Sequence, residues 1–188
     1  MAHVGVLSKS LQILWFSLDS KALCLQTVSV KEIAYLSLGS NLGDRATNLS
    51  AAIAQLEAAG RLQAVSGFYA TQPVDVPDQP WFLNCVIAIE TDKSARDLLQ
   101  VALAIEASMG RMRMSEKGPR NIDIDIVLFG SHVINVRGLH VPHPAMEQRR
   151  FVLAPLAEIA PEVQHPQLRK TAREMLAALP AGQAVRRL

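Results

Sequence analysis

One ten-residue segment, residues 120–129, constrains the fold of this chain more than any other. It reads Arg-Asn-Ile-Asp-Ile-Asp-Ile-Val-Leu-Phe, so isoleucine and aspartate alternate along it. Successive side chains of a β-strand point to opposite faces. We therefore expect a strand whose isoleucines pack on helices, while Asp123 and Asp125 share the other face of a sheet.

The two aspartates would carry like charges about 7 Å apart, because each strand residue rises about 3.3 Å. Such a pair repels itself unless cations lie beside it. Mg²⁺ takes carboxylate and phosphate oxygens together, so the pair can serve as a magnesium site. Each aspartate could instead pair with an arginine in an exposed ladder, and the Asp-x-Asp pattern alone leaves both interpretations open.

The residues directly before this strand form a basic loop. Residues 111–120 contain four basic residues and one acidic residue, and a Gly-Pro pair within them favours a loop. Arginine offers a planar fork that matches phosphate oxygens. Phosphoryl transfer needs mainly positioning and charge stabilisation from the protein. The loop and the carboxylate pair together suit a magnesium polyphosphate, although charge alone also fits a solvated surface.

Several other kinds of site are absent from the sequence. It contains no GxxxxGK[ST], GxGxxG, HExxH or GxSxG motif. His140 and His143 are close in sequence, but Pro142 lies between them and breaks any helix that would align them on zinc. Cys24 and Cys85 form no CxxC pair, which argues against a disulfide framework and fits a reducing, cytoplasmic compartment.

An acceptor pocket is indicated by one polar residue in an apolar strand. Asn84 is flanked by leucine and cysteine, and a buried amide needs partners for both of its ends. A flat heterocycle could supply them, and so could a neighbouring loop. Phe82 and Phe151 could stack on the two faces of such a ring, or each could belong to the core.

The hydrophobic pattern predicts an α+β fold. Strands and helices in the order strand-helix-strand-strand-helix-strand are the ferredoxin-like pattern. We expect an antiparallel sheet with helices on one side, plus a C-terminal hairpin and helical additions. The expected strands are 34–38, 62–70, 82–90 and 122–129, with a hairpin over 130–136; the expected helices run from Asp44 to Gly60, Ser94 to Gly110, 146–150 and 170–179.

Length and composition place the catalytic part in a single domain. The chain has 188 residues with 49% hydrophobic and 19% charged residues, which excludes general disorder. We expect an amphipathic extension of unassigned role over 1–33, a main domain over 34–168, and a C-terminal helix and tail over 169–188. The extension is too polar to span a bilayer, which takes about 20 apolar residues. The net charge of +2 offers no nucleic-acid-binding footprint.

Several strings share one order and spacing with a known enzyme family. They are Tyr35–Asp44, Phe68–Pro73, Asp78–Asn84, Glu106 with Gly110–Arg113, Gly118–Ile126, and Val141–Pro144 with Arg149–Leu156. Taken together, in this order and spacing over about residues 34–166, these strings resemble the 6-hydroxymethyl-7,8-dihydropterin pyrophosphokinases of folate biosynthesis. Any one string alone would be weak evidence for the family.

The resemblance implies a ferredoxin-like fold that transfers pyrophosphate from ATP to hydroxymethyl dihydropterin, with no nucleic-acid or membrane partner. It implies that Asp123 and Asp125 hold two Mg²⁺ with ATP, and that Arg111 and Arg120 stabilise charge during transfer. The loops 71–81 and 111–121 would close over the reaction. The implied ATP-binding residues are Glu106, Arg113, Ile126, His140, His143 and Arg149, and the implied pterin-binding residues are Thr71, Gln72, Val74, Phe82, Asn84 and Phe151.

The chain departs from the family pattern at a few ATP-contacting positions. The basic loop is one residue shorter than in a bacterial relative, and Lys117 stands where an aromatic residue is common. Leu103 replaces a polar helix residue, and Arg137 is displaced by one position. A non-catalytic RNA- or nucleotide-binding module would instead show exposed aromatics on its central strands. A degenerate homologue would have lost the arginines and aspartates that this chain retains.

Overall fold

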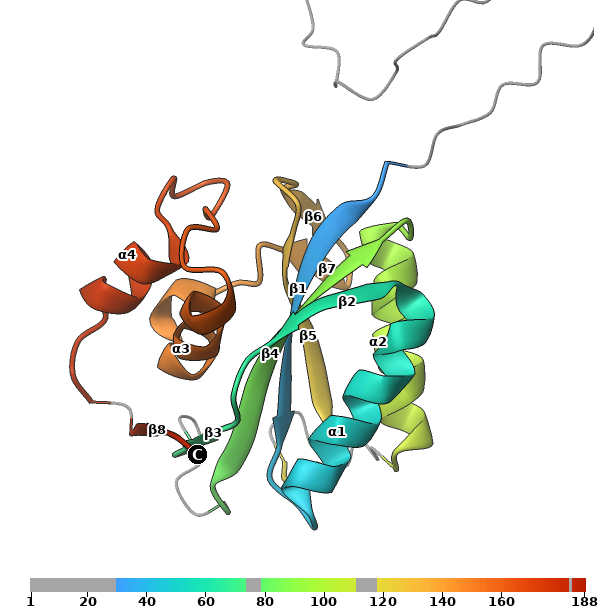
Figure 1. The fold of residues 1–188 in the computed structure, drawn as a ribbon, viewed down its shortest axis with the longest axis vertical. Helices are drawn as coiled ribbons and strands as arrows, with labels where there is room; N and C mark the ends of the chain where they lie inside the picture. The colour runs from blue at the N-terminus through green and yellow to red at the C-terminus, as the bar shows by residue number, and fades with distance from the viewer. Residues whose placement is uncertain (1–29, 74–78, 111–117, 183) are drawn as a thin grey trace, which may run out of the picture. The chain divides into compact units, whose positions relative to one another are not determined.

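The described part of the chain is built around a six-stranded antiparallel sheet, and the helices pack against it (Figure 1). The computed structural model describes residues 30–73, 79–110, 118–182 and 184–188. The strands are β1 (Glu32–Ser40), β2 (Arg61–Val65), β3 (Tyr69–Thr71), β4 (Phe82–Thr91), β5 (Asp123–Phe129), β6 (Ile134–Val136), β7 (Leu139–Val141) and β8 (Val185–Arg187). The helices are α1 (Arg45–Leu56), α2 (Ala95–Ser108), α3 (Arg150–Ile159) and α4 (Ala172–Ala178), with 3-10 turns at Glu57–Ala59 and Met146–Gln148.

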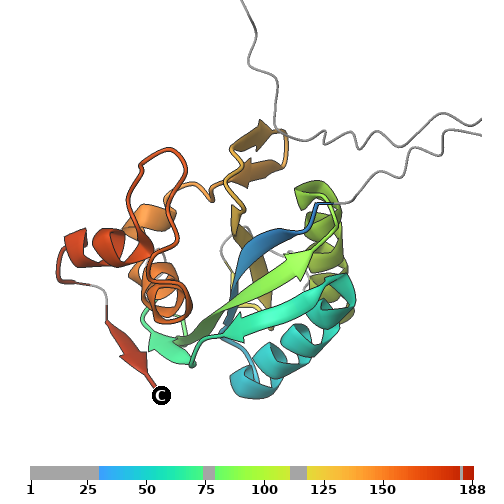
Figure 2. The same cartoon turned by 45° about the horizontal axis from the view of Figure 1, so that its top comes forward.

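The sheet has the strand order expected of a ferredoxin-like fold. Its order is β5-β1-β4-β3-β8, and β2 pairs with the second half of β4. Strands β6 and β7 form a separate hairpin (Figure 2). The predicted α+β class and the ferredoxin-like order are confirmed. The hairpin expected over 130–136 is displaced: Ile134–Val136 pairs with Leu139–Val141, not with the strand that precedes Gly130. In the described part of the chain, no helix has the length and apolar character that a membrane crossing requires.

Two capping side chains set the starts of the long helices. Asp44 Oδ1 accepts a hydrogen bond from the Thr47 N–H at 3.1 Å, and Ser94 Oγ accepts one from the Asp97 N–H at 3.1 Å. Each bond satisfies one of the N–H groups that a helix start leaves unpaired. The sequence predicted that these helices start at Asp44 and Ser94, and both starts are confirmed.

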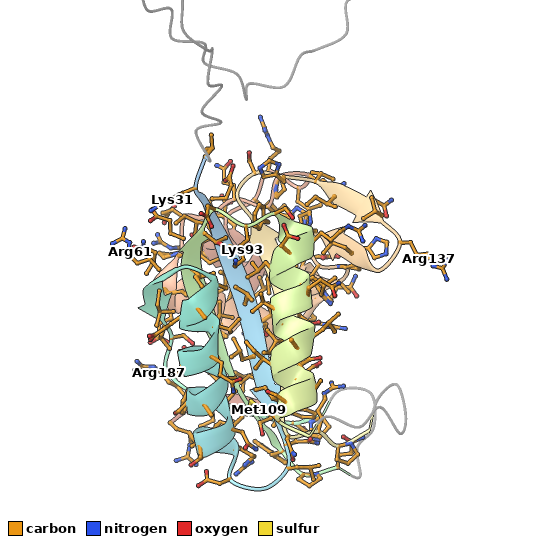
Figure 3. All side chains as sticks on the ribbon, turned by 90° about the vertical axis from the view of Figure 1, so that its right-hand side faces the viewer. Lys31, Arg61, Lys93, Met109, Arg137 and Arg187 are labelled. Carbon is orange, nitrogen blue, oxygen red and sulfur yellow. The ribbon has the colours of Figure 1, made fainter. Side chains whose placement is uncertain are left out.

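Helices α1 and α2 cover one face of the sheet, where the side chains between them and β1 fill the main core (Figure 3). Ile122, just before β5, and the alternate β5 residues Ile124 and Ile126 face this core and are at most 4% exposed. The predicted separation of isoleucines from aspartates is therefore confirmed. The carboxylates of Asp123 and Asp125 belong to the opposite face.

The opposite face is partly covered by α3, on which α4 packs, and apolar residues of both helices form a second core with Val86 and Val127 (Figure 1). Helix α3 was not predicted; the expected helix over 146–150 is only a 3-10 turn that precedes it. Pro155 lies inside α3, and proline normally ends a helix in sequence-based reasoning. Burial of Val152, Leu153 and Leu156 against the sheet outweighs that cost.

Two strand predictions need correction. The strand expected over 62–70 is interrupted, so that β2 and β3 pair with different halves of β4. Strand β8 was not predicted, because its three residues include two arginines and carry no apolar alternation. It forms by pairing Val185–Arg187 with β3. Residues 169–188 therefore contribute both a helix and a sheet strand to the unit formed by residues 31–188.

Strand β5 lies at the edge of the sheet, and other elements cover its outer side. The buried Glu106 of α2 accepts a hydrogen bond from the Ile124 N–H at 2.7 Å. The His143 N–H, just after the hairpin, donates to the Val127 carbonyl at 2.9 Å. These bonds satisfy backbone groups that an edge strand leaves open. They also fix the position of the aspartate-bearing strand at two of its residues, Ile124 and Val127.

Candidate functional site

Three strands bring the predicted acceptor and metal residues into one row. In the register of the sheet, Gly39 of β1 lies opposite Asn84 of β4 on one side and opposite Asp123 of β5 on the other. Ser37 lies opposite Asp125 in the same way. Neighbouring strands are about 4.8 Å apart, so the amide and the first carboxylate arise about 10 Å from each other. The row lies on the face that carries α3.

Gly39 makes the space between these two groups. A Cβ at this position would lie 2.6 Å from Asn84 Oδ1 and 3.7 Å from Phe82 Cδ1. Because Gly39 has no side chain, no atoms rise above the β1 backbone there, and a ligand can lie between the Asn84 amide and the Asp123 carboxylate. Only the backbone of β1 separates them there.

The buried amide of Asn84 is oriented by Thr71. Asn84 Nδ2 donates to Thr71 Oγ1 at 2.7 Å, and both residues are buried. Among the described residues this bond uses one amide N–H, and Oδ1 lies over Gly39. The second N–H and Oδ1 then present a donor and an acceptor side by side. Such a pair matches the hydrogen-bonding edge of a planar heterocycle.

The aspartates lie among basic side chains. Asp123 Oδ2 is 3.0 Å from a terminal nitrogen of Arg120, and Asp125 Oδ2 is 3.9 Å from His143 Nε2. Burial raises the pKa of Asp125, and the negative charge of Asp123 raises it further. Two adjacent carboxylates, one of them with a raised pKa, form a donor set that favours cations. Among the described residues no cluster of three or more metal-ligating side chains occurs, so other oxygens would have to complete the coordination.

Arg120 connects the two halves of the site. Its guanidinium carbon lies 5.6 Å from the centroid of the Phe82 ring, while a terminal nitrogen contacts Asp123. Its Nε is buried and has no hydrogen-bond partner among the described atoms. A buried donor of this kind normally has an acceptor. In the described structure this N–H is therefore unsatisfied.

Four of the six predicted ATP-binding residues lie on the two sides of β5. Arg149 and His143 lie on the aspartate face, and both lower the pKa of Asp125 by their charge, in opposition to burial. Glu106 and Ile126 lie on the side of β5 that faces α2, where Ile126 is 4% exposed. The side chain of Ile126 is packed in the core, so its contact with a nucleotide would be made by the backbone.

The remaining predicted residues lie as follows. His140 is exposed on the hairpin, with Nδ1 2.7 Å from Asn135 Oδ1. The half-buried ring of Phe151 has the Arg149 guanidinium carbon 5.7 Å from its centroid. Gln72 is exposed, and its N–H donates to the Ala184 carbonyl at 3.2 Å. Arg111, Arg113 and Val74 lie outside the described residues.

Two residues of the site were not singled out from the sequence. Gly39 is the last-but-one residue of β1, and Asn41 follows the strand. Both belong to a Gly-Ser-Asn-Leu-Gly string that by itself is a weak signal. Their importance depends on the register of β1 against β4 and β5. The exposed tip of the hairpin carries Arg137, which points away from the sheet (Figure 3).

Known proteins of one family match almost all of the described unit. A protein-family model described as 7,8-dihydro-6-hydroxymethylpterin-pyrophosphokinase (HPPK) matches residues 35–161. A relative from Methylorubrum extorquens, named 2-amino-4-hydroxy-6-hydroxymethyldihydropteridine pyrophosphokinase, is 44% identical over 152 residues, covering 79% of this chain and 95% of the relative. A relative of the same name from Bacillus subtilis is 46% identical over 137 residues, covering 72% and 82%.

Solved structures with the same family name share the fold. A crystal structure of a Plasmodium falciparum HPPK-DHPS triple mutant with SDX-DHP gives a TM-score of 0.68 at 19% identity. The match covers 84% of this chain and 46% of that longer chain. At this level of identity the likeness concerns the fold alone.

Proposed function

The chain belongs to the 7,8-dihydro-6-hydroxymethylpterin-pyrophosphokinase family, and from that premise we propose how its residues carry out the reaction. It is an ATP-dependent pyrophosphokinase of folate biosynthesis that acts on ATP and 6-hydroxymethyl-7,8-dihydropterin. Formation of AMP means that the hydroxymethyl oxygen bonds to the β-phosphorus of ATP. The bond from that phosphorus to the α-phosphate oxygen breaks, and the hydroxyl proton is released.

The acceptor is proposed to lie over Gly39, with its edge on Asn84 and its ring between Phe82 and Phe151. The oriented amide and the absence of a side chain at Gly39 support this placement. Thr71 holds the amide in the orientation in which one N–H and Oδ1 face the ligand. Gln72 and Val74 are proposed to complete the pocket from the adjacent loop.

The phosphates are proposed to lie on the other side of the row, beside β5. Asp123 and Asp125 would hold two Mg²⁺, since adjacent carboxylates suit a cation that also binds phosphate oxygens. Bound with ATP, magnesium would neutralise phosphate charge. The absence of a third acidic or histidine ligand in the described part of the site agrees with ions that share phosphate and water oxygens.

Basic residues are proposed to stabilise charge during the transfer. The buried Nε of Arg120 is a donor that the described protein atoms leave without an acceptor, so a phosphate oxygen would break no existing hydrogen bond once the side chain turned this N–H toward it. Arg111 is proposed to act with Arg120. Arg113, His143 and Arg149, with His140, Glu106 and Ile126, are proposed to contact the nucleotide.

The domain division and the cellular setting are also proposals. Residues 34–168 are proposed to carry the catalytic residues, with 1–33 as an extension; the helix and strand of 169–188 belong to the same compact unit. The requirement for ATP supports a cytoplasmic location. The small net charge of +2 supports small-molecule partners in preference to nucleic acid.

The observation that carries this placement is the row Asn84–Gly39–Asp123 across three strands. The test is to incubate the protein with ATP, Mg²⁺ and the hydroxymethyl pterin and to measure AMP and ADP separately. Stoichiometric AMP with pterin diphosphate is expected, and Asp125→Asn should reduce it while leaving the fold intact. Formation of ADP in place of AMP would contradict a pyrophosphoryl transfer.

A further inference from the structure

One buried side chain beside the proposed ligand-binding residues joins the two halves of the site. Asn41, which is 2% exposed, follows β1 directly. Asn41 Oδ1 accepts a hydrogen bond from the Arg120 N–H at 2.8 Å. The Asn41 N–H donates to the Arg120 carbonyl at 3.1 Å. The two bonds close a ring between the two residues, so the backbone of Arg120 is held at both of its polar groups.

The other end of the same amide reaches the acceptor side. Asn41 Nδ2 donates to Gln79 Oε1 at 3.0 Å and lies 3.5 Å from the Pro80 carbonyl. Gln79 and Pro80 lead into β4, whose first residue is Phe82. The Asn41 side chain therefore connects residues 79–80, which precede β4 and the proposed pterin pocket, with Arg120, which precedes β5 and its two aspartates.

We infer that Asn41 is a positioning residue that holds Arg120 at a fixed place between the acceptor pocket and the phosphate site. The inference rests on the role proposed above for Arg120. Arg120 approaches both Phe82 and Asp123, so a shift of its backbone moves the guanidinium relative to both substrates. Because misplacement by about 1 Å can cost about 100-fold in rate, the backbone anchor matters for turnover.

The chemistry of the anchor requires an asparagine. The site needs an acceptor for the Arg120 N–H and a donor for Gln79, at the length of one short side chain. Aspartate supplies the acceptor alone, and alanine supplies neither. A buried backbone N–H that loses its acceptor costs free energy unless the segment moves to find another partner.

A neighbouring asparagine provides a matched control. Asn48 Nδ2 donates to Ser40 Oγ at 3.3 Å and to the Leu42 carbonyl at 3.0 Å. It stabilises the same turn after β1. None of its described hydrogen bonds involves Arg120 or Gln79. Asn48→Ala therefore reports the cost of loosening the turn without releasing Arg120.

The test is a double-mutant cycle between Asn41→Ala and Arg120→Ala, with kcat and both KM values measured from AMP formation. Asn41→Ala should lower kcat by about 10- to 100-fold, and should change the KM for ATP less than about threefold. In the Arg120→Ala background the same substitution should lower kcat less than about threefold, because coupled residues are not additive. Asn41→Asp should lie between the wild type and Asn41→Ala, and Asn48→Ala should stay within about threefold of the wild type.

A second measurement does not depend on activity. Asn41→Ala should speed hydrogen exchange of the Arg120 amide in the ligand-free protein at least about tenfold, while Asn48→Ala should not. Equal losses of kcat in the two Arg120 backgrounds, or unchanged exchange at Arg120, would overturn the positioning role. A wild type that exchanges as expected but forms no AMP would instead refute the proposed function. If Asn41→Ala does not fold, Asn41→Leu, which is close in volume and also lacks both the acceptor and the donor, carries both measurements.

Discussion

Replacing Gly39 with alanine tests the geometry of the acceptor pocket directly. Gly39 lies in an extended strand paired on both sides, so alanine should suit its backbone. The cost comes from the new Cβ, which would lie 2.6 Å from Asn84 Oδ1. Real Cβ atoms do not approach an oxygen so closely, so the amide has to turn away and lose its bond to Thr71.

The expected magnitude follows from that lost bond. Leaving a buried polar group unpaired costs about 1–3 kcal/mol, while replacing glycine with alanine at a compatible position returns about 0.4–1 kcal/mol. We expect a net loss of about 1–2 kcal/mol in the free energy of unfolding. Since the turned amide of Asn84 can no longer hydrogen-bond the pterin, the KM for pterin should rise by roughly 5- to 150-fold. This corresponds to a loss of about 1–3 kcal/mol in binding free energy.

The assay combines thermal unfolding, steady-state kinetics with varied pterin, and calorimetric titration of ATP. ATP affinity should change less than about threefold, because the phosphates are proposed to lie beside β5. The double variant Gly39→Ala/Asn84→Ala supplies the control: with the amide removed, alanine at position 39 should be neutral or stabilising relative to Asn84→Ala. An equal destabilisation in both backgrounds, or an unchanged KM for pterin, would refute the steric reasoning.

Three further predictions concern other parts of the molecule. Asp125→Asn should hold or raise the melting temperature while weakening use of Mg-ATP, because burial and Asp123 already raise the pKa of Asp125 and so disfavour its charge; full activity at limiting Mg²⁺ would contradict this. Asn84→Leu should weaken pterin binding by at least about 1–3 kcal/mol and leave ATP binding nearly unchanged in calorimetry, and equal effects on both ligands would point to a folding defect. The Tyr69–Glu158 hydrogen bond of 2.7 Å should make stability depend on pH at both extremes. Burial acts to raise the pKa of Glu158, but its hydrogen bonds from Tyr69, Gly67 and Arg187 and the charge of Arg187 together outweigh burial and lower it. Its stabilisation is therefore present above pH 4.5 and lost as pH falls through the lowered value. The pKa of Tyr69 is raised to about 12, mainly by burial and then by Glu158, so its stabilisation is present below pH 10.0 and lost between there and about 12. Unfolding of Tyr69→Phe at pH 9 and 11 should lack the alkaline loss.

The local parts of the fold could be predicted because they depend on neighbours in sequence. Alternation over 120–129 assigned Asp123 and Asp125 to one face, and the cap residues marked the helix starts. A buried amide within an apolar strand indicated Asn84. In each case the responsible contacts lie within a few residues or follow from the two-residue period of a strand.

The rest depends on contacts between distant segments. The space over Gly39 exists because β1 pairs with β4 and β5 in one register. Asn41 matters because residues 79–80 and 120 end beside it. Helix α3 keeps Pro155 because its apolar side is buried on the sheet. None of these pairings leaves a periodic signal in the sequence, so they became visible only in the structure.

The pairing of β8 with β3 has a consequence for how the enzyme matures during synthesis. Thr71, which orients the acceptor amide, lies in β3, whose outer neighbour β8 is encoded far downstream. A ribosome therefore completes β1, β4 and β5, with the carboxylates, well before it delivers the strand that borders β3. Long-range strand pairing is also slow compared with local folding. In a nascent chain the pterin side should become ordered after the phosphate side.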